Sequence, residues 1–311
     1  MFEERKINPE LLKQYREQGY WKNETLLDCW ERAAAQYPDR EYVVDDRGYR
    51  YTYREMDEAA GRVASYLLWL GIRPGEVVSY QFPIWSEFAM LTIACYKVGA
   101  VAHPIAMSYE EKELARSLNV TESRCYFGPT YFYKTDYEER ILAVRDQTPL
   151  LKDIVLIDSV KPAKSSVRLL REILASYEPL PKEQCVHTKN GQDIAVILCT
   201  SGTTGGTKGV LLSHDNVRFA EEAFNRELGL TKEDIMFMPA PLHHATGFHH
   251  AIIAPMLYGG KVVLQQKYQC RAAIDLMNRE KVTYSMGATP FIYDILRELD
   301  ANGGGLPTLK F

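Results

Sequence analysis

The sequence predicts an α/β fold with largely parallel sheets flanked by helices. Helix and strand patterns alternate along the chain, and this alternation is typical of parallel strands joined by helices that cover both faces of a sheet. The chain has 311 residues, of which 46% are hydrophobic and 25% are charged, as in ordinary globular domains. The 37 basic and 41 acidic residues leave no basic excess, so a nucleic-acid-binding protein is disfavoured.

Local patterns predict the first elements. Segment 42–51 places Asp46-Arg47-Gly48 between two short runs rich in tyrosine and valine, which indicates a β-hairpin. Capping boxes, in which a hydroxyl residue is followed three positions later by a glutamate, predict two helix starts. These pairs are Thr52 with Glu55, and Ser108 with Glu111.

Short apolar segments predict the buried strands. They are 77–82, 154–157, 194–199, 235–238, 261–264 and 282–286. Ligands of open α/β sheets bind at loops that follow the carboxyl ends of strands. We therefore expect the functional site in the loops after Cys199, Met238 and Met286.

Cysteine usage and the apolar segments indicate a cytoplasmic protein. The six cysteines are scattered without a C-x-x-C pair, which argues against a zinc module or a disulfide framework. Segment 1–21 carries charges throughout, so no secretory signal is predicted. The most apolar stretch, 88–107, is interrupted by Lys97 and His103. We interpret it as a buried helix followed by a strand, without a transmembrane segment.

Segment 197–214, ILCTSGTTGGTKGVLLSH, is the candidate phosphate-binding loop. Its glycines let backbone N–H groups converge on an anion, its hydroxyls add hydrogen-bond donors, and Lys208 adds a positive charge. Because Lys208 lies between Thr207 and Gly209, neither a Walker P-loop nor a Rossmann fingerprint fits. A flexible Ser/Thr/Gly surface loop is the alternative, but its place between a strand and an apolar run argues against it.

This loop resembles the signature phosphate loop of the adenylate-forming (AMP-binding) superfamily, which includes acyl-CoA synthetases, nonribosomal adenylation domains and firefly luciferases. Four other segments resemble family segments in the same order: YTYREMDEAAGRVASYL (51–67), YKVGAVAHP (96–104), PLHHATGF (241–248) and MGATPFIYDIL (286–296). Thr207 stands where the family usually has proline, which loosens the loop. The likeness is greatest to bacterial short- and medium-chain fatty acyl-CoA synthetases.

The resemblance implies an AMP-forming acid–thiol ligase that uses ATP, Mg²⁺ and coenzyme A. A carboxylate attacks the α-phosphate of ATP to give an acyl-adenylate, which a thiol then attacks, so catalysis depends on positioning and charge stabilisation. Lys208 and His244 are the implied catalytic residues. The implied phosphate-binding residues are Thr200, Ser201, Gly202, Thr203, Thr204, Gly205 and Lys208. The implied substrate residues are His244, Phe248, Gly287, Ala288 and Thr289.

The sequence also restricts the chemical class of the acid substrate. Segment 238–250 contains no Asp or Glu, whereas a domain for amino acids needs a carboxylate there to pair with the substrate ammonium. An apolar acid is therefore expected, although the suggested pocket residues suit core packing equally well. The histidines at 243, 244, 249 and 250 form no second ligand pair, so no metal site is predicted, and His249 and His250 are expected to have local partners.

The resemblance covers nearly the whole chain. It implies that residues 1–311 are the N-terminal part of the AMP-binding domain, because the family's ribose-binding aspartate, its late lysine and its small C-terminal domain find no match. We therefore expect this polypeptide alone to be inactive. The alternatives are a non-catalytic nucleotide-binding fragment, or an enzyme that loads a carrier protein. A serine hydrolase is disfavoured because no G-x-S-x-G motif occurs. The expected partners are an acid, ATP and coenzyme A, with homo-oligomerisation left open.

Overall fold

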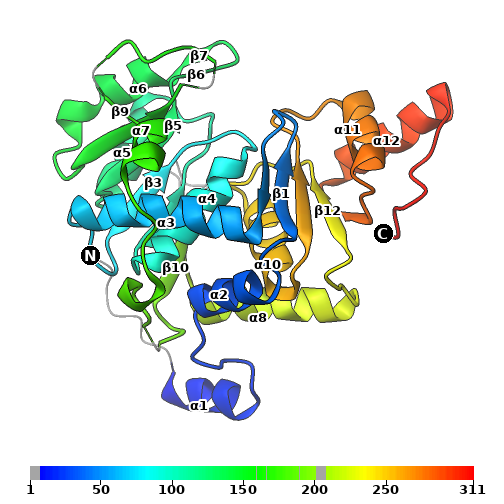
Figure 1. Ribbon diagram of the computed structural model, residues 1–311, viewed down its shortest axis with the longest axis horizontal. Coiled ribbons are helices and arrows are strands. Elements are labelled where there is room, and N and C mark those ends of the chain that lie inside the picture. The colour runs from blue at the N-terminus through cyan, green and yellow to red at the C-terminus, as the bar shows by residue number, and fades with distance from the viewer. Residues whose placement is uncertain (1–7, 159, 166, 189, 201–207) are drawn as a thin grey trace. The chain divides into compact units, whose positions relative to one another are not determined.

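A computed structural model describes residues 8–158, 160–165, 167–188, 190–200 and 208–311 (Figure 1). The chain divides into two compact units, each built on its own sheet. Unit 1 contains Glu58–Phe82, Leu91–Phe219 and the residues up to Asp28. Unit 2 contains Cys29–Asp57, Pro83–Met90 and Ala220–Phe311.

The sheet of unit 1 has seven strands in the order β11-β10-β4-β3-β5-β8-β9. All neighbours are parallel except the antiparallel pair β10 and β11. The strands are β3 (Val77–Tyr80), β4 (Val101–Pro104), β5 (Cys125–Pro129), β8 (Asp153–Ile157), β9 (Arg168–Leu169), β10 (Ile194–Thr200) and β11 (Lys208–Ser213). The short strands β6 (Tyr131–Phe132) and β7 (Thr135–Asp136) form a separate ribbon.

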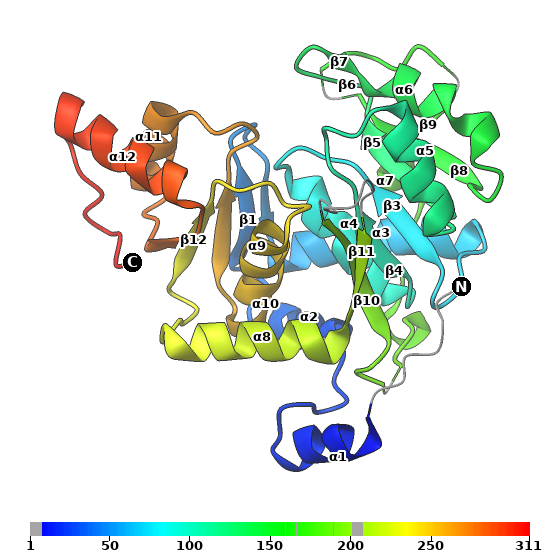
Figure 2. The same ribbon diagram turned by 180° about the vertical axis from the view of Figure 1, so that it is seen from behind.

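In the part of the chain that the structure describes, unit 1 also contains six helices that lie wholly within its residues. They are α1 (Pro9–Glu17), α5 (Glu111–Val120), α6 (Tyr137–Ala143), η1 (Arg145–Gln147), α7 (Leu170–Ser176) and η2 (Lys182–Gln184). Helix α6 contacts β5 and α7 contacts β8 (Figure 2). Leu114, Tyr126, Ile141 and Leu156 are buried together in this layer. Such apolar burial is the main favourable term that stabilises the unit.

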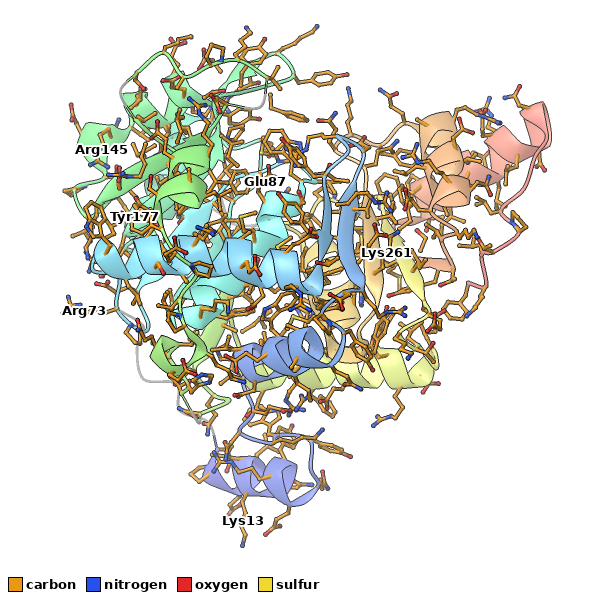
Figure 3. The ribbon with its side chains drawn as sticks, viewed as in Figure 1. Lys13, Arg73, Glu87, Arg145, Tyr177 and Lys261 are labelled. Atoms are coloured by element: carbon orange, nitrogen blue, oxygen red, sulfur yellow. The ribbon has the colours of Figure 1, made fainter. Side chains whose placement is uncertain are left out.

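The sheet of unit 2 has five strands in the order β14-β12-β13-β1-β2. The first four are parallel, and β2 is antiparallel to β1. The strands are β1 (Glu41–Asp45), β2 (Arg50–Thr52), β12 (Ile235–Met238), β13 (Lys261–Leu264) and β14 (Tyr284–Ser285). On β13, Lys261 (labelled in Figure 3) donates from Nζ to Glu41 on β1 at 2.6 Å and to Glu280 at 2.8 Å.

Four of the remaining helices contain residues of both units. These are α2 (Leu26–Gln36), α3 (Tyr53–Trp69), α4 (Ser86–Lys97) and α8 (His214–Glu227). Unit 2 also contains α9 (Ala245–Gly247), the π-helix η3 (Phe248–Ile253), α10 (Ala254–Tyr258), α11 (Cys270–Arg279) and α12 (Thr289–Asn302). Within the described residues, none of the helices has the length and apolar character needed to cross a bilayer.

The largely parallel α/β architecture confirms the predicted fold class, and β1 and β2 confirm the hairpin in 42–51. The first capping box is also confirmed, because the Thr52 backbone N–H donates to the Glu55 carboxylate at 2.8 Å. The second is wrong. Helix α5 begins at Glu111 without a side-chain cap, because the Tyr109 N–H donates to the Ala106 carbonyl at 3.1 Å and places Ser108 inside a turn. The strand predicted at 282–286 is limited to β14.

Candidate functional site

The candidate phosphate-binding segment connects the two strands of a hairpin in unit 1. Strands β10 and β11 lie side by side (Figure 2). In their antiparallel ladder Thr200 is paired with Lys208, so the two ends of the segment lie opposite each other. Lys208 is exposed at the start of β11. Five of the predicted phosphate-binding residues lie outside the described residues: Ser201, Gly202, Thr203, Thr204 and Gly205. The side chain of Thr200 also lies outside them. The hairpin therefore fixes where the segment starts and ends.

A buried polar cluster lies beside the end of β10. The fully buried His103 on β4 places its Nδ1 2.7 Å from the Ser79 hydroxyl and its Nε2 3.6 Å from the Cys199 sulfur. The Ser123 hydroxyl donates to the Ser79 oxygen at 2.7 Å, so the Ser79 hydroxyl can donate its own hydrogen bond to the His103 Nδ1. In that arrangement the ring proton of His103 is on Nε2. Burial lowers the pKa of His103 to about 3, so the ring is neutral. Sequence reasoning missed this cluster, which supports the residue directly before Thr200.

In unit 2, His244 lies in the loop that follows β12. It occupies the N-cap position of α9 and is exposed. Its backbone N–H donates to the Pro241 carbonyl at 3.1 Å, and its carbonyl accepts from the Phe248 N–H at 2.8 Å. The neighbouring His243 is half-buried, and burial lowers its pKa to about 4 with a smaller contribution from His244. These bonds fix the backbone that presents His244.

The segment that follows β14 lies next to this loop. Because β12 and β14 are parallel neighbours, the loops at their carboxyl ends lie at the same edge of the sheet. A Cβ atom on Gly287 would lie only 2.9 Å from the Pro239 side chain, so the two segments are in close contact. Ala288 and Thr289 are exposed at the start of α12.

Phe248 differs from the other predicted substrate residues because it is fully buried. Its ring centroid lies 6.4 Å from that of Phe88, in an edge-on arrangement. This contact corresponds to the core-packing alternative that the sequence left open for this residue.

His249 and His250 share one buried partner, Glu221 on α8. The His249 Nδ1 lies 3.1 Å and the His250 Nδ1 3.0 Å from the Glu221 carboxylate oxygens, so both histidines have a partner, but it lies on a distant helix and is not local in the sequence. Burial opposes ionisation of Glu221, but the two imidazole hydrogen bonds outweigh it and hold its pKa below the ordinary value. An ionised carboxylate can only accept, so both rings donate from Nδ1. Within the described residues, no group of three or more potential ligands could bind a metal ion.

Substituting Glu221 with glutamine is expected to destabilise unit 2 by about 1–3 kcal/mol, because an amide would turn a donor toward one of the two Nδ1–H groups. Chemical unfolding of the variant would measure the loss. Glu227→Gln, an exposed change at the end of the same helix, is the matched control and should stay close to the parent. Equal stability of the two variants would show that the buried carboxylate is not needed.

Several known proteins are similar to this chain in sequence or in fold. The family described as AMP-binding enzyme matches residues 30–311. The chain is 40% identical over 297 residues to the medium-chain fatty-acid–CoA ligase of Escherichia coli (strain K12), covering 96% of this chain and 52% of that protein. It is 26% identical over 282 residues to a 2,3-dihydroxybenzoate-AMP ligase of Bacillus subtilis (strain 168), covering 90% of this chain and 50% of that protein.

The fold is similar to that of the apo structure of MbtA from Mycobacterium smegmatis, with a TM-score of 0.84 at 23% identity, over 94% of this chain and 53% of the other. The chain spans about half the length of the curated relatives that it matches. The match to the family extends over most of the chain and includes the signature segment, the β10–β11 hairpin and the His244 loop. The chain therefore belongs to the AMP-binding family of adenylate-forming enzymes.

Proposed function

We propose that the chain carries the acid- and nucleotide-binding part of an ATP-dependent acid–thiol ligase for a short- or medium-chain fatty acid. In the proposed reaction, a carboxylate oxygen bonds to the α-phosphorus of ATP while the bond to the pyrophosphate oxygen breaks. The thiol of coenzyme A then bonds to the acyl carbon and displaces AMP. ATP, Mg²⁺ and coenzyme A are the implied co-substrates and metal, and residues 1–311 correspond to the N-terminal part of the adenylation domain.

The residue roles follow from chemistry and position. Residues 200–205 supply backbone and hydroxyl donors to the phosphates, and Lys208 neutralises the charge that accumulates on the departing pyrophosphate. The exposed His244 orients the acid carboxylate, and residues 287–289 border its acyl chain. Lys208 is exposed and paired with Thr200. It therefore adds a positive charge directly after the glycine-rich segment, which suits the binding of a polyphosphate.

The observation that carries the proposal is the signature segment within a chain that is 40% identical, over 96% of its length, to a medium-chain fatty-acid–CoA ligase. The absence of Asp and Glu from segment 238–250 supports an acid without an amino group. The test is ATP–pyrophosphate exchange by the protein expressed from its complete gene, with octanoate, butyrate, palmitate, salicylate and phenylalanine as acids. Octanoate or butyrate should give the fastest exchange, and exchange with phenylalanine alone would overturn the proposal.

Lys208→Ala is expected to lower octanoate-dependent exchange about 100-fold, because the charge on the pyrophosphate would lose its mobile counter-ion. Steady-state exchange with an unchanged unfolding temperature would measure the effect. Lys232→Ala, a change outside the proposed binding segments, is the control and should retain exchange. A Lys208→Ala variant with parental exchange would remove Lys208 from the proposed mechanism.

An aryl acid loaded onto a carrier protein is the second candidate. The similarity to a 2,3-dihydroxybenzoate-AMP ligase favours it, although at lower identity. Exchange with salicylate but not octanoate would select this candidate. Pyrophosphate exchange without transfer to coenzyme A would separate a carrier-protein enzyme from an acyl-CoA ligase.

A further inference from the structure

Unit 1 contains a cavity of about 420 Å³. It lies beside Gly75, Gly99 and Ile194, which stand at the amino ends of β3, β4 and β10. The signature segment follows the opposite, carboxyl end of β10. A strand of that length spans roughly 20 Å, so the cavity and Thr200, where the phosphate segment begins, lie at opposite ends of one strand.

The cavity wall combines apolar and polar residues. Leu27, Val101, Ile194 and Leu211 are among its apolar lining residues. A concave site of a few hundred Å³ with apolar walls and a few polar groups is the usual form of a small-molecule site. Its apolar surface would favour an alkyl or aryl group, since removing such a group from water is favourable.

His214 provides a polar anchor in this wall. Its Nδ1 accepts a hydrogen bond from the Leu26 backbone N–H at 3.1 Å, so Nδ1 carries no proton. Burial lowers the pKa of His214 to about 4, which keeps the ring neutral near pH 7. The single ring proton is therefore on Nε2, which is the hydrogen-bond donor of this cavity-lining ring.

The charge of the lining selects against anions. Asp193 contributes a carboxylate, whose Oδ1 accepts from the Asn190 side chain at 2.8 Å. The lining includes no lysine or arginine from the part of the chain that the structure describes. A carboxylate ligand would therefore be placed near a like charge with only a neutral imidazole to bind it, which is unfavourable.

We propose that this cavity is a second ligand site, for an uncharged and mainly apolar small molecule whose oxygen accepts a hydrogen bond from His214. Such a ligand differs in charge from the carboxylic acid proposed as substrate. The site goes beyond the proposed function and does not depend on it, because all its lining residues belong to unit 1.

The test compares 1-octanol with octanoate, which share chain length but differ in charge. Backbone amide NMR of the protein would follow Gly75, Gly99 and Ile194 during each titration. 1-Octanol should shift these amides saturably, and octanoate should bind there at least tenfold more weakly. Saturable shifts confined to unit 2, or equal affinity for the two compounds in the cavity, would overturn the proposal.

Two variants locate the binding. His214→Asn retains an acceptor for the Leu26 N–H but loses the Nε2 donor, so 1-octanol affinity should fall roughly threefold to tenfold. Leu211→Trp should fill the cavity and abolish the shifts. Leu212→Trp, on the opposite face of the same strand, is the matched control and should bind as the parent does. Unchanged binding in both His214→Asn and Leu211→Trp, with native-like spectra, would place 1-octanol elsewhere.

Discussion

Replacing Gly247 with alanine is expected to destabilise unit 2 by about 3 kcal/mol or more. The new Cβ would lie 2.2 Å from the Pro241 carbonyl oxygen and 2.7 Å from the Leu242 Cα. Both are backbone atoms, so no side-chain rotation can relieve the clash. The loop must open instead, and it carries the hydrogen bond between the His244 N–H and Pro241. The segment PLHHATGF therefore requires glycine at position 247, because the backbone of Pro241 and Leu242 leaves no room for a side chain.

Chemical unfolding measured for Gly247→Ala would give the free-energy change directly. Gly305→Ala is the matched control in the same unit, because a Cβ at Gly305 meets no atom within 4 Å among the residues described. A Gly247→Ala protein as stable as the control would mean that the loop adapts at no cost. The variant should also lose octanoate-dependent exchange if His244 orients the acid as proposed.

A steep loss of stability is expected as the pH falls from about 6.5 to 4, because unit 1 buries two neutral histidines. Burial lowers the pKa of His103 to about 3 and that of His214 to about 4. The unfolded chain binds protons on these rings below the ordinary pKa of 6.5, whereas the folded chain does not. Their contribution is therefore complete above pH 6.5 and is lost as the pH falls toward the folded values. Each ring contributes a slope of up to about 1.4 kcal/mol per pH unit.

Unfolding free energies measured at pH 7, 6, 5 and 4.5 would test this slope. His103→Asn should give a lower stability at pH 7 but a shallower dependence on pH, because one of the three histidines with a lowered pKa (His103, His214 and His243) is gone. His187→Asn, which changes an exposed ring, is the control and should retain the parental slope. A parental slope in His103→Asn would show that His103 is not the source.

Local and periodic signals predicted the scaffold well. The bounds of β12 and β13 coincide with the predicted segments, because short apolar runs in parallel sheets are buried on both faces. The Thr52–Glu55 capping box could be predicted from the sequence because its two residues are only three positions apart, at the start of one helix. Ser108 and Glu111 have the same sequence pattern, but Ser108 lies in a turn in which the Tyr109 N–H donates to the Ala106 carbonyl. Ser108 therefore does not cap the helix.

The polar clusters could not be predicted, because their members come from distant segments. Ser79, His103 and Cys199 lie on three strands of unit 1, and only the order of those strands brings them together. Glu221 likewise meets His249 and His250 through helix packing. A pattern in the sequence can identify a loop suited to phosphate, but it cannot identify the buried side chains that support the loop.

The pairing of β1 with β13 has a consequence for protein synthesis. Val43 lies beside Val262 in a parallel register, so β1 leaves the ribosome long before its neighbour exists. At about 5–20 residues per second, the wait is on the order of tens of seconds. During that time the β1–β2 hairpin has an unpaired edge, which is open to pairing with other nascent chains. All residues of unit 1 have been made before β13 appears, so the ribosome sets an order in which unit 1 can fold first and unit 2 completes its sheet last.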